Sequence, residues 1–294
     1  MQTLNRHASV VIRLTRVDEY LGFVIVTAFF GFNVAGAFTL NLPLVAVILG
    51  NLLAVAFAFM INDVEDASDD AHDLAKVHRN PVSAGDVSAR TAYIASFAVA
   101  GMAAAAYAFA GWRPFVLGVL CLLLGLLYSW RFVRLKAIPG ADVVSHVLLL
   151  AALQFLCAYF TFQSGGWTWV LPCLFVVLIS TYGQLFNQLR DFEGDRLAGY
   201  TNTAALAGKR VTQWSLFAIL GAALVVLALC VWLGIVPERI LLLALIVAPV
   251  VAFRQVREMA TADAKHVTSP FQEPMILVGV VAMLAWWFGG AVWG

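Results

Sequence analysis

Two short segments of this sequence repeat one pattern of amide and carboxylate side chains. Each has the form Asn-x-x-x-Asp-x-x-x-Asp, at Asn62, Asp66 and Asp70 and again at Asn187, Asp191 and Asp195. On a helix, residues four apart lie one above another, so each segment would present its three side chains as one stripe. Like charges at this spacing repel one another. The repetition of the stripe therefore predicts that a cation is bound.

The ligand atoms that both stripes offer are oxygens, because neither His nor Cys stands at the repeated positions. This donor set favours a hard ion such as Mg²⁺ over zinc. Mg²⁺ keeps several waters and commonly joins one or two carboxylates to substrate phosphates, so we expect a phosphorylated ligand between the stripes. The alternative is that both segments are solvated acidic loops. Acidic residues contribute little to membrane orientation, however, and a generic loop has no reason to repeat the register.

Basic side chains stand close to both the first stripe and the end of another apolar run. Arg79 follows the first stripe, and Arg131, Arg134 and Lys136 follow Tyr128. Arg and Lys at these places can bind phosphate oxygens and stabilise a departing diphosphate. The alternative is that they anchor the chain at the membrane surface or contact anionic lipid.

The elements that carry these motifs are apolar. Hydrophobic residues make up 62% of the 294 residues and charged residues 12%, a low charged fraction for a soluble domain. Continuous apolar runs of about twenty residues are long enough to cross a membrane as helices. Hydropathy predicts spans near 19–40, 43–61, 91–111, 114–130, 141–163, 167–187, 213–233, 239–253 and 274–293. We therefore predict an all-α integral membrane protein with about nine transmembrane helices in one bundle around a central cavity.

The charged residues predict the orientation of this bundle. If every span crosses, the N-terminus shares one side with loops 62–90, 131–140, 188–212 and 254–273. All Lys and Arg residues except Arg113 and Arg239 fall on that side, which the positive-inside rule makes cytoplasmic. We expect a multi-pass protein of the cell membrane whose N-terminus and motif-bearing loops are cytoplasmic.

Net charge and cysteine placement argue against other classes of protein. The net charge is +1, so bulk electrostatics predict neither nucleic-acid binding nor an acidic partner. The four cysteines lie inside apolar runs without a Cys-x-x-Cys pair, at Cys121, Cys157, Cys173 and Cys230. We expect them to be small buried hydrophobic residues rather than metal ligands or disulfides.

Taken together, the stripes, their place after the second and sixth spans, and the helix count resemble the UbiA family of membrane prenyltransferases. The family's first signature is similar to Asn62-Asp63-x-x-Asp66-x-x-x-Asp70 followed by residues 79–85, and its second resembles residues 190–199. The segment from Tyr128-Ser129 to Lys136 is similar to a basic segment of the family. The resemblance covers essentially the whole chain, which we expect to be a single domain over residues 1–294.

The resemblance implies a cavity among the helices with both motifs at its cytoplasmic mouth. It implies that Mg²⁺, held by the six stripe residues, binds a polyprenyl diphosphate, whose prenyl group passes to a lipophilic acceptor as diphosphate leaves. Asp63 lies about 100° round the helix from Asn62, and we expect it to take a proton from the acceptor or to orient it.

The same resemblance implies which side chains contact the diphosphate. Arg79, Arg131, Arg134 and Lys136 are expected to assist its departure, with Arg131 and Lys136 as catalytic groups, and Tyr128 belongs to the same segment. The family usually has a basic residue soon after its second motif, where this chain has Tyr200-Thr201-Asn202. We expect Lys209 or Arg210 to supply that contact instead.

The acceptor is open at this stage. Residues 134–146 resemble those of family members that act on carotenoids such as lycopene, while quinone precursors, glycerol-phosphate ethers and chlorophyllide remain alternatives. A terpene cyclase of the same family would let a double bond of the substrate capture the cation. From another class, a transporter of divalent cations or phosphorylated solutes could use acidic stripes, but transporters place such sites near the bilayer midplane rather than at span ends.

Overall fold

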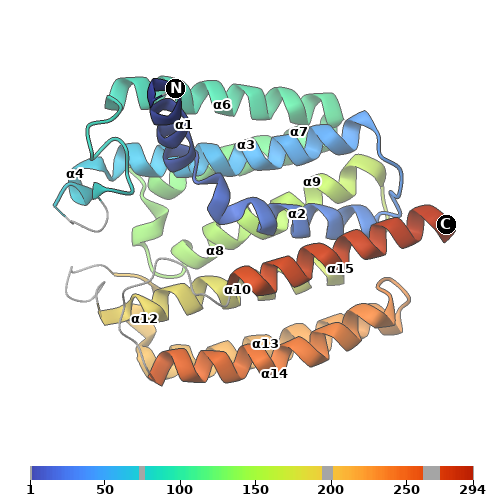
Figure 1. Cartoon of the computed structure of the whole chain (residues 1–294). Coiled ribbons are helices and arrows are strands. Elements are labelled where there is room, and N and C mark those ends of the chain that lie inside the picture. Colours follow the sequence, from blue (N-terminus) through green and yellow to red (C-terminus); the bar gives the residue numbers. More distant parts are fainter. Residues whose placement is uncertain (1, 73–76, 194–200, 261–271, 294) are drawn as a thin grey trace.

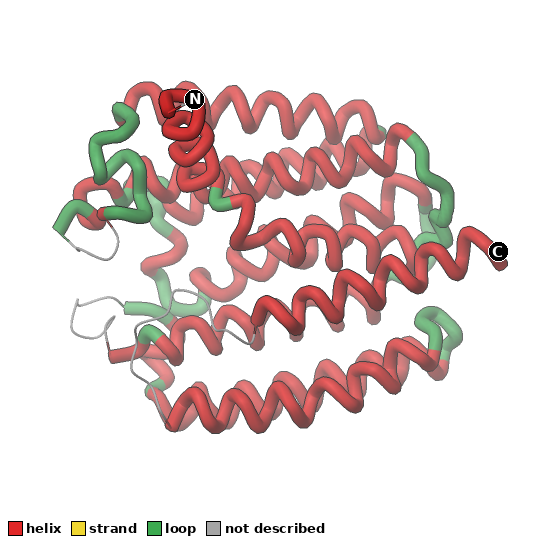
Figure 2. The backbone as a smooth tube through the Cα atoms, in the orientation of Figure 1, coloured by secondary structure: helices red, strands yellow, loops and turns green. Residues whose placement is uncertain are grey.

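The computed structural model describes residues 2–72, 77–193, 201–260 and 272–293, and these form helices joined by short connections (Figures 1 and 2). The helices, with η1 a 3₁₀ turn and η2 a π-helical turn, are α1 Gln2–Thr15, α2 Val17–Val34, α3 Leu42–Glu65, α4 Ala67–Asp70, α6 Ala89–Ala110, α7 Trp112–Ser129, η1 Leu135–Ala137, α8 Ala141–Val147, η2 Leu148–Ala152, α9 Leu153–Phe162, α10 Val170–Arg190, α12 Thr203–Ala207, α13 Lys209–Trp232, α14 Glu238–Ala260 and α15 Gln272–Trp293. The expected all-α class is confirmed.

Within the described residues, seven helices are long and apolar enough to cross a membrane, namely α2, α3, α6, α7, the run Ala141–Phe162, α10 and α13. The predicted spans near 239–253 and 274–293 are also helical, as α14 and α15, but they are not among these seven, so a count of nine is not confirmed. The chain is a multi-pass membrane protein.

The long helices lie side by side and their connections gather at the two ends of the bundle (Figure 2). The connections that follow α3, α7 and α10 share one end, and the turns after α2, α9 and α13 share the other (Figure 1). Because both acidic segments follow helices that finish at the first end, we call it the motif end. The expectation that the two acidic segments lie on the same side of the bundle is confirmed.

Helix α3 is the central helix of the bundle. It begins at Asn41, whose side chain accepts a hydrogen bond from the backbone N–H of Leu44 at 3.0 Å, and Pro43 occupies its first turn. About two thirds of the residues in its apolar stretch are buried inside the protein, compared with 22% for α6. Most of the surface of α6 therefore faces the lipid. The acidic segment after α3 is therefore carried by the most enclosed helix of the protein.

Small residues let α3, α6 and α7 approach closely. A Cβ atom on Gly118 of α7 would lie 2.1 Å from the ring of Tyr107, and one on Gly50 would lie 2.9 Å from it. Tyr107 is fully buried, and its hydroxyl hydrogen-bonds Asn51 Oδ1 at 2.9 Å. Such packing is a main source of helix association in lipid, where burial of apolar surface supplies little driving force.

The span Ala141–Phe162 is not a regular α-helix. Its middle, Leu148–Ala152, forms a π-helical turn between α8 and α9. His146, before this turn, and Leu150, within it, line a cavity, whereas Phe155 and Tyr159 after it belong to a buried core cluster. The four cysteines are free and buried, as expected.

Candidate functional site

The first acidic segment keeps the helical register that its spacing predicts. Helix α3 ends at Glu65, and α4 resumes at Ala67 after a single intervening residue. The N–H of Asp66 bonds to the carbonyl of Asn62 at 3.0 Å, and the N–H of Asp70 bonds to that of Asp66 at 2.8 Å. Asn62, Asp66 and Asp70 therefore form one stripe.

The oxygens of Asn62 and Asp66 converge on a single positive charge. The ammonium group of Lys136 lies 2.8 Å from Asn62 Oδ1 and forms an ion pair with Asp66. Burial lowers the pKa of Lys136, and the negative charge of Asp66 opposes that effect. The stripe can therefore direct two of its oxygens at one cation, as a magnesium site requires.

Arg134 supplies a second positive charge at the same place. Its guanidinium bonds Asp66 Oδ1 at 3.2 Å and Asp69 Oδ2 at 2.9 Å. Its backbone is left-handed, with φ of 46°, a conformation that costs a non-glycine residue free energy and that surrounding contacts must maintain. The basic segment therefore places two positive charges, those of Arg134 and Lys136, against the first stripe.

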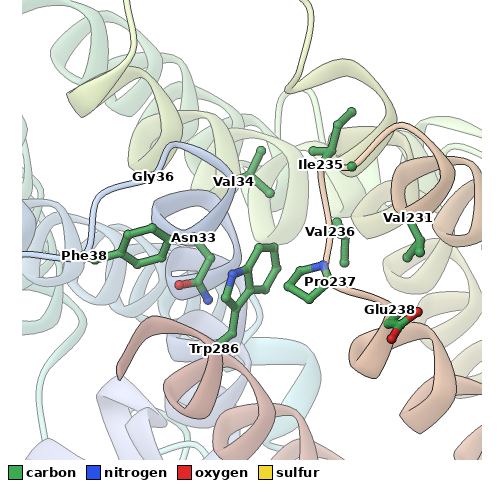
Figure 3. A pocket seen from close by; sticks show the side chains of 11 residues that line it. Asn33, Val34, Gly36, Phe38, Val231, Ile235, Val236, Pro237, Glu238 and Trp286 are labelled. Atoms are coloured by element: carbon green, nitrogen blue, oxygen red, sulfur yellow. The ribbon is translucent and has the colours of Figure 1, made fainter. Parts of the chain in front are cut away.

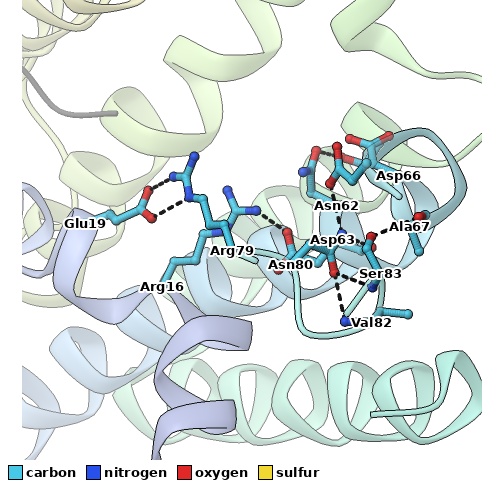
Figure 4. Close-up of polar contacts among 12 residues, drawn as sticks. Arg16, Glu19, Asn62, Asp63, Asp66, Ala67, Arg79, Asn80, Val82 and Ser83 are labelled. Carbon is cyan, nitrogen blue, oxygen red and sulfur yellow. Dashed lines mark hydrogen bonds and ion pairs between the residues drawn. The ribbon is translucent and has the colours of Figure 1, made fainter. Parts of the chain in front are cut away.

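Asn80 ties the third stripe residue to the loop that follows it. Its side-chain amide donates to Asp70 Oδ2 at 2.9 Å and to the backbone carbonyl of Asp63 at 2.8 Å (Figure 4). Its oxygen accepts from the N–H groups of Val82 and Ser83 at 3.0 and 3.3 Å. This fully buried asparagine thus fixes the loop against the end of α3.

Asp63 lies on a different side of α3 from the stripe. Its side chain is fully buried and forms an ion pair with Arg16, which is itself only 10% exposed at the start of α2 (Figure 4). Arg16 also has a left-handed backbone, with φ of 51°, and its guanidinium lies 5.4 Å from the centre of the Phe59 ring. This placement favours a structural role for Asp63 over contact with an acceptor.

Arg131 turns away from the first stripe, whereas Tyr128 lies near Asp66 and Gln184. Arg131 is 69% exposed and faces Glu65, which accepts its backbone N–H at 3.1 Å and lies 3.5 Å from its Nε. The Tyr128 ring lies 6.4 Å from the ring of His146, centre to centre. The expectation that Arg131 and Tyr128 bind diphosphate alongside Arg134 and Lys136 stays a prediction.

The second acidic segment ends α10. Asn187 lies in its last turn, and Asp191 follows it with a half-exposed carboxylate 3.2 Å from Arg190 Nε. Lys209, at the start of α13, lies 3.8 Å from Glu193. Asp195 falls outside the described residues. Among the residues that are described, no three His, Cys, Asp or Glu side chains gather into a metal cage.

A cavity of about 610 Å³ opens beside the second segment. Its polar side carries Asn187, Arg190, Asp191, Glu19 and Arg79. Its other walls are mostly apolar and come from α2, α3, α8, η2, α10, α13, α14 and α15, among them Phe23, Phe175, Leu220, Val247 and Ile276. The first stripe does not line the cavity, but Arg79, in the loop held by Asn80, does. The arrangement suits a ligand with an anionic head and an apolar tail.

A buried carboxylate joins the basic segment to the second acidic segment. Asp142, at the start of α8, accepts hydrogen bonds from Gln188 Nε2 and from the N–H of Thr203, both at 2.8 Å. Gln188 in turn accepts the N–H of Ala204 at 3.0 Å. These hydrogen bonds hold α8, α10 and α12 together near the motif end.

A second cavity, of about 530 Å³, lies at the opposite end of the bundle (Figure 3). Asn33, Trp286 and Glu238 line it together with the turn between α13 and α14. Asn33 is already bound there, because its side chain donates to the carbonyl of Met283 at 2.9 Å. None of the predicted site residues lines this second cavity.

Sequence reasoning missed three residues that the structure places at the site. Arg16, Glu19 and Asp142 all lie within or beside apolar runs, where a charged side chain is costly and marks a partner or a function. The presence of a charged residue within or beside an apolar run is the feature of the sequence that could have identified them. The partners themselves lie far away in sequence, at Asp63, Arg79 and Thr203.

The model of the UbiA prenyltransferase family matches residues 24–288. A curated relative, digeranylgeranylglyceryl phosphate synthase of Metallosphaera sedula, is 26% identical over 207 residues, which are 69% of each chain.

Solved structures share the fold. A UbiA homologue from Archaeoglobus fulgidus bound to GPP and Mg²⁺ superimposes with a TM-score of 0.75 at 20% identity, over 96% of this chain and 99% of that one. The apo structure of a UbiA homologue from Aeropyrum pernix K1 gives 0.65 at 17% identity, over 93% and 97%. At these identities the likeness concerns the fold.

Proposed function

The chain belongs to the UbiA prenyltransferase family, and from that membership we propose that it transfers a polyprenyl group from a polyprenyl diphosphate to a lipophilic acceptor, with Mg²⁺ as cofactor and diphosphate as the other product. The observation that carries this proposal is the cavity at the motif end, whose polar side holds Asn187, Asp191 and Arg79 and whose other walls are apolar. A diphosphate would occupy the polar side and its prenyl chain the apolar interior. The family membership identifies a prenyltransferase and so displaces the transporter alternative.

We assign the metal to the two stripes, that is, to Asn62, Asp66, Asp70, Asn187, Asp191 and Asp195. The convergence of Asn62 and Asp66 oxygens on the Lys136 ammonium supports this assignment, because the same oxygens suit a hard divalent cation. Bound there with the substrate, Mg²⁺ would neutralise negative charge on the diphosphate as the bond to the prenyl carbon breaks.

The basic residues nearest the stripes would bind the diphosphate oxygens. Lys136 and Arg134 already face Asp66, and Arg79 faces the cavity, so all three can reach a phosphate placed between the motifs. Charge-assisted contacts of this kind stabilise a departing diphosphate. Arg131, Tyr128 and Lys209 remain proposed contacts, and of these Arg131 and Lys209 would have to turn from Glu65 and Glu193, which they face.

The acceptor is the finer part of the proposal. The curated relative is named for a glycerol-phosphate lipid, which favours an acceptor with a polar head and an apolar body. A carotenoid such as lycopene and a quinone precursor remain alternatives, as does cyclisation of the prenyl diphosphate without any acceptor. Mass spectrometry of products made with and without candidate acceptors separates these outcomes, since a cyclic hydrocarbon formed from prenyl diphosphate alone identifies a cyclase.

We also propose that the motif end faces the cytoplasm of the cell. The charge asymmetry supports this orientation, because the far end carries Arg113 and Arg239 as its basic residues. Soluble prenyl diphosphates made in the cytoplasm would then reach the polar side of the cavity directly.

The test uses purified protein, Mg²⁺ and prenyl diphosphates of several lengths. Wild-type protein should release diphosphate and form a prenylated product, and Asp66→Ala and Asp191→Ala should each abolish both. Glu238→Ala, which removes an acidic residue at the opposite end, serves as the matched control and should keep normal rates. Mg²⁺-dependent release that is unchanged in both Asp variants would contradict the assignment of the stripes.

A further inference from the structure

A carboxylate outside the acidic motifs faces the cavity. Of the described residues that line it, two carry a carboxylate: Asp191, which belongs to the second stripe, and Glu19. Glu19 lies in the first turn of α2, next to Tyr20, and Phe23 lies one turn further along the same helix. Since Tyr20 and Phe23 also line the cavity, Glu19 lies at the boundary between the polar side of the cavity and its apolar wall.

The side chain of Glu19 is held by Arg79. Its Oε1 accepts from Arg79 Nε at 3.1 Å, and its Oε2 forms an ion pair with Arg79 Nη2, so the contact is bidentate (Figure 4). Both side chains are partly exposed, at 24% and 34%. The pair therefore borders open space rather than sitting sealed in the core, in contrast to the Arg16–Asp63 pair beside it.

Transfer to an acceptor requires a group that receives a proton. When the acceptor atom bonds to the first carbon of the prenyl group, the acceptor must lose the hydrogen that this atom or its neighbour carries. Asp63 is enclosed by its pair with Arg16. Asp191 is committed to the stripe. Glu19 lies outside the stripe, and although Arg79 holds it, its carboxylate stays partly exposed to the cavity.

We propose that Glu19 is the proton acceptor of the transfer reaction, and that Arg79 releases it by moving to the diphosphate. This inference rests on the proposed function. The bond between the prenyl carbon and the diphosphate oxygen breaks, and its electron pair leaves with diphosphate. A bond forms between that carbon and the acceptor, and the acceptor's proton passes to the Glu19 carboxylate, from which water later removes it.

The exchange of partners follows from the chemistry of the guanidinium group. Arginine binds phosphate through the same two-pronged geometry that it uses with a carboxylate, and a diphosphate carries more charge than Glu19. A diphosphate at the polar side of the cavity therefore competes for Arg79. Once Arg79 has moved, Glu19 faces the cavity as a free carboxylate. The base would thus become available only when the prenyl donor is in place.

His146 is the other group in the cavity that could receive a proton. It lies on α8 beside Tyr128. The geometry favours Glu19 because Arg79 connects it directly to the place where the diphosphate would bind. The two residues can be separated by substitution.

The experiment compares Glu19→Gln with Asp18→Asn, a matched control that removes the exposed neighbouring acid from the same helical turn. Glutamine keeps the shape of Glu19 and one hydrogen-bond acceptor for Arg79. We expect the single-turnover rate of prenyl transfer to fall about 100-fold or more in Glu19→Gln, the usual effect of losing a general base. Affinity for a prenyl thiolodiphosphate should be unchanged or higher, because Arg79 is held less tightly. Glu19→Asp should recover part of the rate.

Several results would overturn the inference. Transfer at a normal rate by Glu19→Gln would contradict it, as would a parallel loss of thiolodiphosphate affinity and thermal stability, which indicates a structural role. Loss of transfer in His146→Asn with normal transfer in Glu19→Gln would move the role to His146. Absence of transfer by the wild type contradicts the proposed function as well, whereas a normal Glu19→Gln protein contradicts the assignment of Glu19 alone.

Discussion

Replacing Arg16 by Met should destabilise the protein more than replacing its partner Asp63 by Asn. Loss of one member of a buried ion pair costs about 3–5 kcal/mol, because the other charge stays in a medium that solvates it poorly. Asp63 is fully buried, so Arg16→Met leaves such a charge behind. Within the described part of the chain, Asp63 Oδ2 and Arg16 Nε have no hydrogen-bond partner, which places the expected cost at the lower limit, about 3 kcal/mol.

The opposite change, Asp63→Asn, leaves the positive charge of Arg16, which is less deeply buried than Asp63. Arg16 is 10% exposed and its guanidinium lies over the Phe59 ring, so it can turn toward water when Asp63 becomes Asn. The loss is then about one charge-assisted hydrogen bond, or about 2 kcal/mol. In the double variant Arg16→Met/Asp63→Asn no charge remains, and the two side chains should show a coupling free energy of about 2–3 kcal/mol.

Equilibrium unfolding in mixed micelles with increasing SDS measures these free energies for the four proteins of the cycle. Arg113→Met, at the other end of the bundle, is the matched control for loss of an arginine. A cost below about 1 kcal/mol for Arg16→Met, or additive single variants, would show that the pair is solvated or unformed. Asp63→Asn should in addition retain prenyl transfer, because Glu19 rather than Asp63 is assigned the proton.

Two further changes probe the site and the packing. Lys136→Met should raise the KM for prenyl diphosphate by about tenfold or more through loss of the charge beside Asn62, as measured by initial rates, with Arg113→Met unchanged; equal KM values would remove Lys136 from the diphosphate site. Gly118→Ala should lower stability by about 1–3 kcal/mol, because its Cβ meets the Tyr107 ring at 2.1 Å, whereas Gly101→Ala, with no atom within 4 Å, should not. Thermal unfolding in detergent checks both glycine variants.

The local part of the site could be predicted from the sequence. A spacing of four residues is a property of the helix itself, so Asn62 and Asp66 were expected on one face, and they meet the same ammonium group. The position of Lys136 at a span end predicts a phosphate contact, and the structure places its ammonium group beside this stripe. The helical spans followed from hydropathy because lipid forces the backbone to satisfy its own hydrogen bonds.

The long-range part could not be predicted in this way. Glu19 and Arg79 are 60 residues apart, and Arg16 and Asp63 are 47 apart, so no periodicity in the sequence relates them. The cavity wall draws on α2, α3, α8, η2, α10, α13, α14 and α15, and most of the residues that line it are apolar. Apolar residues look alike in sequence whether they face lipid or a ligand. Asp63 was assigned to the acceptor for the same reason, since its angle on α3 was known but not the residue that covers it.

The π-helical turn at Leu148–Ala152 has a consequence for how this protein can change over evolution. Such a turn adds one residue relative to an α-helix, and one residue corresponds to a rotation of about 100°. The half that carries His146 is therefore rotated by about 100° from the direction that an unbroken α-helix would give it relative to the half that carries Phe155. Substitutions in α8 that reshape the cavity for a new isoprenoid can therefore accumulate while α9 keeps its packing against α2 and α10.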